Sequence, residues 1–265
     1  MTDISFGPST RPWHYSKTTK TFDLSGDSKN KLQFSATEGP SGTQVTIAAD
    51  STALVIVDMQ NFFLDARCME HKEGLAAIDP TIKVIEKCRA AGIQVIWLNW
   101  GLTEHDMETM PGGVQRGFMK DEIAASTSEL RPWMGLGAEL PDDQGRCLFA
   151  DTWNADIYPP LKKHVDSSDI HCAKNRMSGL WTPEQPLWKV LEKEKISTVL
   201  YAGVNTDQCV LGTFVDGYNA GWNSILIDDC CGTPTLGAKE VTLLNIASCY
   251  GFVTNSTSFS AAKAV

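Results

Sequence analysis

The feature that most constrains the fold is an alternation of short apolar runs with segments of helical spacing, which begins near Thr52 and continues to Phe252. Each run is rich in β-branched and aromatic residues, and most are followed by apolar residues that recur every three or four positions. The runs expected to be strands are 52–58, 94–100, 169–173, 198–204, 223–229 and a short one near 252. This pattern predicts an α/β fold, in which an open parallel six-stranded sheet carries helices on both faces.

Two parts of the chain lack this alternation. Residues 1–50 are polar with isolated aromatics such as Trp13 and Phe22, and we expect a largely irregular arm that docks on its own domain or on a neighbouring subunit. Residues 51–265 are expected to form one domain. Within it, the stretch 101–151 is irregular, and an insertion of that length in a compact domain usually covers or lines a site.

Composition narrows the function to small-molecule chemistry. The 265 residues are 42% hydrophobic, which suits a globular core, and the net charge is −9 without any run of Lys or Arg. That charge argues against nucleic acid and anionic membranes as partners. The sequence lacks a signal-peptide pattern at its start and an apolar stretch of about 18 residues. We therefore expect a cytoplasmic protein whose eight cysteines are thiols.

Three chemically active side chains each follow a predicted strand. Asp58 ends the first strand, Lys174 follows the third, and Cys209 follows the fourth, in the first turn of a helix. Each has an ordinary interpretation: a helix cap, a solvated surface lysine and a small buried hydrophobe. The carboxyl ends of parallel strands share one edge of a sheet, where such folds bind ligands. The three side chains are therefore predicted to meet in one site.

These three groups also fit together chemically. Asp58 would accept the proton of the Cys209 thiol, and Lys174 would hold the carboxylate in place. The position at a helix start predicts a lowered pKa for the Cys209 thiol. The backbone N–H of Cys209 and one from the preceding turn would face an oxyanion. The sequence thus predicts nucleophilic acyl transfer.

Three ordered motifs carry a resemblance to a known family. They are D-x-Q-x-x-F at 58–63, K-x-R-x-S-G at 174–179 and G-V-x-T-x-x-C-V at 203–210. From about Thr52 to its end, the chain resembles the isochorismatase-like cysteine hydrolases. The resemblance implies a Rossmann-like sheet of strand order 3-2-1-4-5-6 and a catalytic triad of Asp58, Lys174 and Cys209. It also implies a cis peptide before Asn205, whose N–H would join that of Cys209 in an oxyanion hole.

Departures from the family pattern indicate a branch. Metal-binding nicotinamidases carry Asp-x-His after the second strand, whereas this chain has Asn99, Trp100 and Gly101 there, so we expect no metal and no cofactor. True isochorismatases lack the cysteine nucleophile, and Cys209 therefore points to hydrolysis of a C–N bond. The chain looks most like the metal-independent branch acting on ureidoacrylate, N-carbamoylsarcosine or biuret. Met177 stands where some ureidoacrylate hydrolases have tyrosine, which argues against that substrate.

Side chains on the strand-end loops are expected to wall a pocket for a small amide or ureide. The expected substrate-binding residues are Gln60, Phe63, Asn99, Trp100, Trp153, Met177, Trp181 and Gln208. The resemblance further implies a homo-oligomer, either a dimer or a tetramer. Other interpretations stay open: an isochorismatase-type or nicotinamidase-type hydrolase of another small molecule, or a catalytically idle binding protein on the same fold. A dinucleotide or flavin binder is disfavoured, because no G-x-G-x-x-G follows the first strand.

Overall fold

The computed structural model describes residues 3–38, 41–69, 71–119 and 135–265, and it contains every strand predicted from the alternating pattern. These strands are β6 (Thr52–Val57), β7 (Gln94–Trp100), β10 (Ile170–Lys174), β11 (Thr198–Val204), β12 (Asn223–Gly232) and β13 (Phe252–Thr254). Neighbours pair in parallel, in the spatial order β10-β7-β6-β11-β12-β13. Numbered along the chain, this order is 3-2-1-4-5-6, so the order reverses between β6 and β11. The predicted α/β class with a parallel central sheet is confirmed.

The two strands at the reversal are buried along their whole length. Every residue of β6 and β11 is buried, as expected of apolar runs in the middle of a sheet covered on both faces. Gly203 of β11 pairs with Val57 of β6. It has a φ of +117°, and a Cβ there would lie 2.0 Å from the Val57 carbonyl oxygen. Only glycine allows this approach of the two strand ends.

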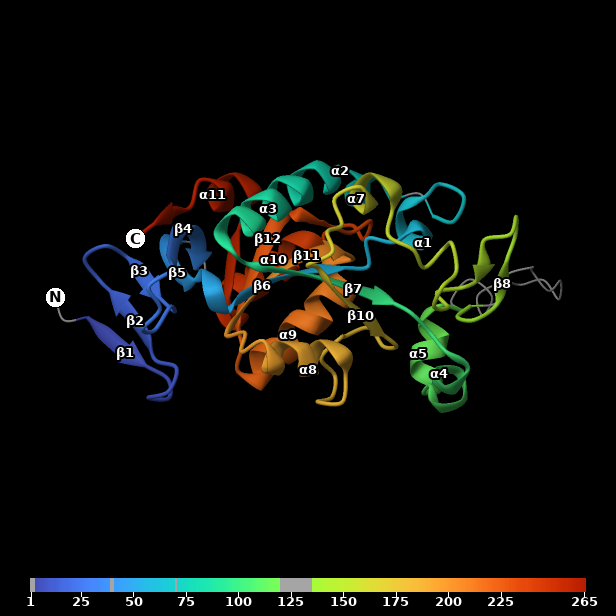
Figure 1. Cartoon of the computed structure of the whole chain (residues 1–265), viewed down its shortest axis with the longest axis horizontal. Helices are drawn as coiled ribbons and strands as arrows, with labels where there is room; N and C mark the ends of the chain where they lie inside the picture. The colour runs from blue at the N-terminus through green and yellow to red at the C-terminus, as the bar shows by residue number, and fades with distance from the viewer. Residues whose placement is uncertain (1–2, 39–40, 70, 120–134) are drawn as a thin grey trace.

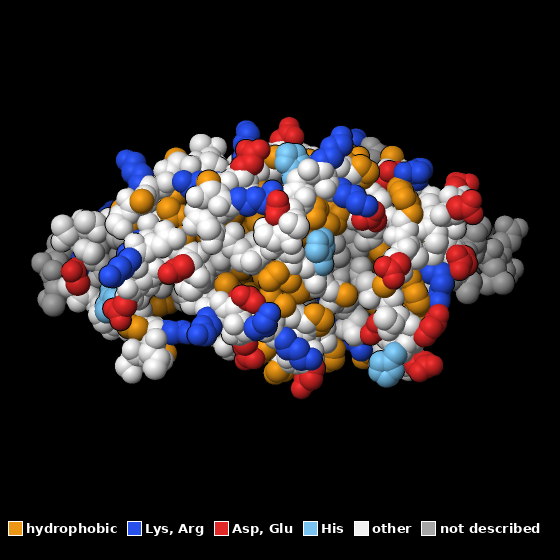
Figure 2. Space-filling view, viewed as in Figure 1, with side chains coloured by type: hydrophobic (Ala, Val, Ile, Leu, Met, Phe, Trp, Pro, Cys, Tyr) orange, Lys and Arg blue, Asp and Glu red, His pale blue; other side chains and the backbone are white. Residues whose placement is uncertain are grey.

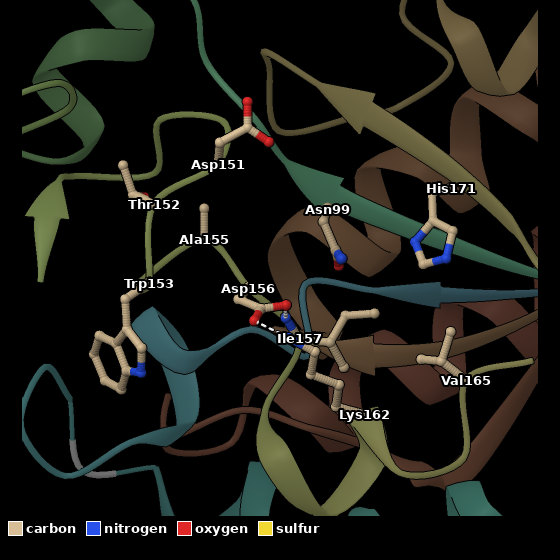
Figure 3. Close-up of a pocket in the computed structure, with 10 residues that line it drawn as sticks. All are labelled: Asn99, Asp151, Thr152, Trp153, Ala155, Asp156, Ile157, Lys162, Val165 and His171. Carbon is tan, nitrogen blue, oxygen red and sulfur yellow. Dashed lines mark hydrogen bonds and ion pairs between the residues drawn. The ribbon is translucent and has the colours of Figure 1, made fainter.

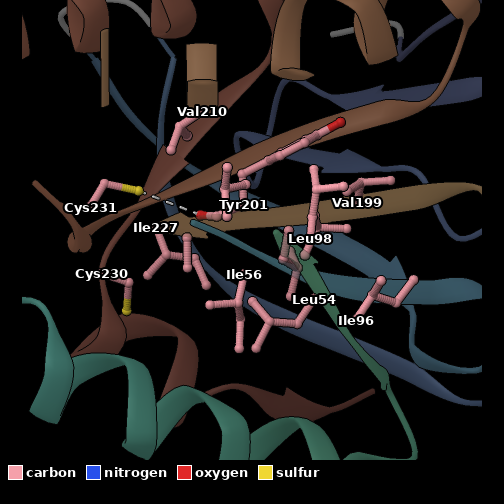
Figure 4. Packing of buried hydrophobic residues seen from close by; sticks show 14 of the residues in the cluster. Leu54, Ile56, Ile96, Leu98, Val199, Tyr201, Val210, Ile227, Cys230 and Cys231 are labelled. Atoms are coloured by element: carbon pink, nitrogen blue, oxygen red, sulfur yellow. Dashed lines mark hydrogen bonds between the residues drawn. The ribbon is translucent and has the colours of Figure 1, made fainter. Parts of the chain in front are cut away.

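Side chains of the central strands pack into one continuous core, part of which is drawn in Figure 4. The adjacent Cys230 and Cys231 of β12 are buried free thiols. They point to opposite sides of the sheet in Figure 4, as successive residues of a strand do. Cys231 lies with its Sγ 3.8 Å from the Tyr201 carbonyl oxygen. Both cysteines therefore serve packing.

Helices cover both faces of the sheet. On one face lie α3 (Ile78–Ala91) and α11 (Ser256–Ser260), and on the other lie α8 (Pro186–Lys193) and α9 (Leu211–Ala220), as Figure 1 shows. α3 ends at Gly92, whose φ of 75° is the left-handed conformation that closes many helices. The other helices of this region are α1 (Asn61–Leu64), α2 (Lys72–Ala76), α7 (Pro159–Lys162), η2 (Thr206–Val210), α10 (Ala238–Asn245) and η3 (Ile246–Tyr250).

The N-terminal segment extends the sheet, so the prediction of a largely irregular arm is wrong. It contains β1 (Ile4–Phe6), β2 (Trp13–Ser16), β3 (Thr21–Asp23), β4 (Lys31–Glu38), β5 (Ser41–Ala48) and the turn η1 (Ala49–Ser51). β4 pairs antiparallel with β13, and the last strand, β14 (Lys263–Ala264), pairs with β4. The described residues thereby form a sheet of 12 strands instead of six. In Figure 1 the strands β1 to β5, in blue, form one end of the molecule.

This extension is fastened to the parallel strands by side-chain contacts. The Trp13 Nε1 donates to Oδ1 of Asn223 at 2.8 Å. The ring of Trp13 lies 5.5 Å from that of Phe252 and 6.3 Å from that of Phe22, between centroids. The N-terminal segment therefore packs on its own chain, which is one of the two alternatives predicted for it; the other was packing on a neighbouring subunit.

The predicted insertion at 101–151 lies at the opposite end of the molecule in Figure 1. It holds α4 (Glu104–Thr109), α5 (Gly112–Gly117), β8 (Glu139–Leu140) and β9 (Gly145–Arg146), while its residues 120–134 lie outside the described part. Thr103 and Asp106 form a capping box at the start of α4.

The surface carries mixed charge, and on the face in Figure 2 lysine and arginine side chains are interspersed with aspartate and glutamate. In the ranges that the structure describes, no helix combines the length and the apolar character needed to cross a bilayer.

Candidate active site

Asp58 and Cys209 follow the two strands at the reversal, and Lys174 stands at the carboxyl end of β10, which β7 separates from β6. Asp58 directly follows β6 with a φ of 53°, a left-handed conformation that aspartate tolerates. Lys174 is the last residue of β10. Cys209 lies in η2, a turn of π-helix between β11 and α9. The sheet thus brings together three residues that are far apart in sequence.

The three side chains form one buried cluster. The Lys174 Nζ lies 2.9 Å from Oδ2 of Asp58 and 3.5 Å from Sγ of Cys209. It also donates to the Arg176 carbonyl oxygen at 3.1 Å, so all three ammonium protons have partners. Asp58 is 0%, Lys174 1% and Cys209 7% exposed. Water therefore screens these charges little.

Trp100 forms the floor beneath the lysine. Its ring centroid lies 3.9 Å from the Lys174 Nζ, a cation–π contact. Gln60 holds the Trp100 backbone from both sides: its Nε2 donates to the Trp100 carbonyl oxygen at 2.8 Å, and its Oε1 accepts from the Trp100 N–H at 3.0 Å. Gln60 therefore positions the tryptophan that supports the lysine.

Burial sets the protonation of the cluster. It raises the pKa of the Asp58 carboxyl, and the Lys174 charge opposes that rise only in part. Burial also raises the pKa of the Cys209 thiol to about 12, to which the neighbouring Asp58 charge contributes and which Lys174 opposes. The prediction of a lowered thiol pKa is therefore wrong, because desolvation outweighs the helix start. At neutral pH the proton resides on sulfur, beside a carboxylate made more basic by burial.

A hydrogen-bonded chain from another element fixes Asn205. The Val204–Asn205 peptide is cis, as the resemblance implied. The Asn205 Oδ1 lies 2.6 Å from Nε2 of His71, whose Nδ1 accepts from the Gly74 N–H at 2.8 Å. Because Nδ1 is an acceptor, the ring proton is on Nε2 and is donated to Asn205. His71 is fully buried, so this arrangement is shielded from water.

Cys209 opens onto a cavity of about 660 Å³. Its walls come from the segment after β6, the end of β7, α5 and the loop after it, the lysine motif and η2. The lining residues are Phe62, Phe63, Met69, Trp100, Gly113, Val114, Gly117, Phe118, Met177, Asn205, Gln208, Cys209 and Pro234. Apolar side chains dominate, and the amides of Asn205 and Gln208 stand beside the sulfur.

The structure places only some of the expected substrate-binding residues in this cavity. Phe63, Trp100, Met177 and Gln208 line it, together with the expected oxyanion-hole residues Asn205 and Cys209. Met177 is 49% exposed, at the rim. The other four expected residues, Gln60, Asn99, Trp153 and Trp181, do not line it, which corrects the prediction.

Each of these four residues has a different position. Gln60 is fully buried beneath Trp100. Asn99 and Trp153 line a separate cavity of about 730 Å³, which also includes His171 and is drawn in Figure 3. Trp181 is 45% exposed, with its Nε1 donating to Oδ1 of Asn175 at 3.3 Å.

The structure adds residues that the sequence analysis did not single out. Phe62, Met69, Val114 and Phe118 line the cavity, and His71 supports Asn205. Phe62 neighbours the D-x-Q-x-x-F motif, but His71 carries no local pattern, since its partner is 134 residues away. No group of three or more His, Cys, Asp or Glu side chains is arranged to hold a metal ion among the residues described.

Known proteins are similar to this chain over most of its length. A ureidoacrylate amidohydrolase, RutB, of Methylorubrum extorquens strain AM1 is 30% identical over 227 residues, covering 82% of this chain and 85% of that protein. One from Acinetobacter baylyi is 27% identical over 222 residues, covering 81% and 84% of the two chains. Each of these matches covers more than four fifths of this chain.

Solved structures share the fold. A cysteine hydrolase from Pseudomonas syringae pv. phaseolicola superposes with a TM-score of 0.64 at 20% identity, covering 81% of this chain and 92% of its own. An N-carbamoylsarcosine amidase from Thermoplasma acidophilum gives 0.56 at 21% identity, covering 78% and 96%. The sequence profile of the isochorismatase domain matches residues 52–258. Since that profile spans most of the chain, the protein belongs to the isochorismatase family.

Proposed function

We propose that this protein is a cysteine-dependent hydrolase of C–N bonds in a small amide, ureido or carbamoyl compound. The observation that carries the proposal is the buried cluster of Cys209, Asp58 and Lys174 at the end of an apolar cavity. The relatives named ureidoacrylate amidohydrolase and the structural neighbour named N-carbamoylsarcosine amidase support the same class of substrate.

The reaction begins with transfer of the Cys209 proton to Asp58. The sulfur then attacks the carbonyl carbon, and the negative charge that forms on oxygen is stabilised by the N–H groups of Asn205 and Cys209. Collapse of this intermediate breaks the C–N bond, and Asp58 returns the proton to the leaving ammonia or amine. An acyl thioester remains on Cys209.

Water completes the cycle. Asp58 accepts a proton from the water that attacks the thioester, and the acid product leaves as the thiol regains its proton. Lys174 holds the carboxylate of Asp58 at the sulfur. The scheme uses only side chains, backbone N–H groups and water.

The test is ammonia release from a panel of ureides and primary amides. Cys209→Ala should lower kcat/KM by at least about 1,000-fold, because the nucleophile is lost. Cys249→Ser is the matched control: that cysteine is free and exposed, and its replacement should leave the activity unchanged. Full activity in Cys209→Ala would remove the proposal. Tight binding without any turnover by the unaltered protein would favour the idle binding protein.

A further inference from the structure

We infer that the substrate carries an uncharged, apolar group beside its scissile amide or ureide. The inference rests on the proposed function, because it concerns what else the Cys209 cavity holds during the reaction. It distinguishes this chain from relatives named for ureidoacrylate, which by its name bears a carboxylate.

The cavity is much larger than the reacting group. Its volume of about 660 Å³ lies within the range of roughly 300–1,000 Å³ that encloses ligands of drug size. An amide or urea moiety placed against Cys209 would leave most of that space unfilled. The remaining space must therefore be matched by a further part of the substrate.

The walls of that space are a connected aromatic surface. The Phe118 ring lies 5.3 Å from that of Trp100 at 78° and 6.5 Å from that of Phe62, between centroids. Phe62 in turn packs edge-on against Phe63 at 5.0 Å. The rings come from α1, from the end of β7 and from the residue that follows α5. Their mutual packing fixes an apolar surface before any ligand arrives.

In the described part of the lining, polar side chains are confined to the reacting end of the cavity. Asn205 and Gln208 line the cavity together with Cys209, and the side-chain oxygen Oδ1 of Asn205 is already engaged by His71. These amides suit the polar head of an amide or ureide. They are neutral and therefore do not compensate a charge elsewhere in the cavity.

No charged side chain lines the cavity in the described ranges. In the described part of the chain, the Lys174 Nζ lies 3.5 Å from the Cys209 Sγ, but this lysine is 1% exposed and donates to Asp58, Cys209 and Arg176. Arg176 turns its guanidinium over the Trp181 ring, 5.1 Å from the centroid. A carboxylate entering the cavity would lose its hydration without gaining a cation. An apolar group entering the cavity would leave water, in which its exposure is unfavourable, and its transfer would therefore favour binding.

Two pairs of nearly isosteric compounds test the inference. 3-Methylbutylurea and 3-ureidopropionate differ by an isopropyl group in place of a carboxylate, as do 4-methylpentanamide and succinamate. We expect kcat/KM to favour the uncharged member of each pair by at least about 100-fold. We expect Cys209→Ala, which cannot react, to bind the uncharged members more tightly in calorimetry.

A charge placed in the wall should reverse the preference. Val114 lines the cavity from α5, and Val114→Arg should raise kcat/KM for 3-ureidopropionate while lowering it for 3-methylbutylurea, narrowing their ratio by at least about 10-fold. Val114→Met controls for side-chain length. Gln115→Arg adds the same charge on the same helix but outside the cavity lining, and should leave the ratio unchanged.

The outcomes separate this inference from the function on which it rests. Cys209-dependent turnover that prefers the charged members would overturn the inference and leave the proposed function intact. If no compound is hydrolysed, the proposed function fails, and the binding measurement still decides the inference. Equal or tighter binding of the charged members would overturn it.

Discussion

At the scale of single residues, the chemistry depends on where the proton of the cluster resides. Burial raises the pKa of both Asp58 and Cys209. A raised pKa keeps sulfur protonated at neutral pH and makes the carboxylate a better proton acceptor. In the proposed mechanism the thiolate would therefore form only as Cys209 attacks, instead of standing ready beforehand.

Alkylation of Cys209 reports this arrangement. In the unaltered protein, the rate of iodoacetamide modification at Cys209 should keep rising with pH beyond 10, because its pKa is raised to about 12. Asp58→Asn removes a charge that raises that pKa and leaves Lys174, which lowers it. We expect alkylation at pH 7 to become roughly 10-fold faster, while turnover falls at least about 1,000-fold. Peptide mass spectrometry measures the alkylation rate of Cys209 in both proteins, with the exposed Cys249 as internal reference. Ammonia release measures their turnover. Slower alkylation in the variant would contradict the assigned electrostatics.

His71 provides a second test at this scale. His71→Leu leaves the Asn205 Oδ1 without its buried donor, which costs about 1–3 kcal/mol. We expect kcat to fall by roughly 5- to 100-fold with a smaller change in KM. The reason is that a displaced Asn205 would weaken stabilisation of the oxyanion more than it weakens binding of the substrate. His71→Gln keeps a donor and should recover most of the loss. Equal losses in both variants would indicate a purely structural role.

At the scale of elements, the strand ends were predictable and the pocket walls only in part. The cluster was predictable because apolar runs locate the strands, and parallel strands bring Asp58, Lys174 and Cys209 to one edge. Which residues line the cavity depends on the direction of their side chains, and this direction alternates between successive residues of a strand. Asn99 and Trp100 are adjacent in β7, so only one of them can face Cys209, and it is Trp100. Sequence spacing does not show which of two neighbours faces the site.

The close contact of β6 and β11 gives a prediction at this scale. Gly203→Ala would place a Cβ 2.0 Å from the Val57 carbonyl oxygen at a φ of +117°. Because backbone must move, we expect the free energy of unfolding to fall by more than about 2 kcal/mol and activity to be lost. Gly42→Ala is the control, since a Cβ there meets nothing within 4 Å. Urea denaturation measures the free energy of unfolding of both variants. A Gly203→Ala protein as stable as Gly42→Ala would contradict this interpretation of the contact between β6 and β11.

At the scale of the whole molecule, the main correction concerns the N-terminal strands. Leu32, Phe34 and Ala36 are buried and alternate with polar residues in β4, which is a strand signal. It is short, and the partner strand β13 lies more than 200 residues away, so the local pattern did not reveal the pairing. The segment now covers the edge of β13, where an unpaired strand would invite aggregation. The homo-oligomeric state stays a prediction, to be measured by light scattering.

Trp13 tests whether these strands stabilise the whole fold. Trp13→Ala removes its hydrogen bond to Asn223 and its ring contacts. We expect a loss of about 2–4 kcal/mol, seen as a Tm lower by roughly 5–10 °C. Trp181→Ala is the matched control on an exposed loop and should change the Tm by no more than about 1 °C. An unchanged Tm for Trp13→Ala would mean that the N-terminal strands add nothing to the stability of the sheet.

The central claim is that Cys209 carries the acyl group of the substrate during turnover. The most direct measurement quenches the protein in acid within milliseconds of mixing with a hydrolysed amide or ureide, and then weighs the intact chain and its peptides by mass spectrometry. We predict an added mass equal to the acyl group, confined to the peptide that contains Cys209 and absent from Cys209→Ala. Turnover at full rate without that adduct, and undiminished in Cys209→Ala, would contradict the account.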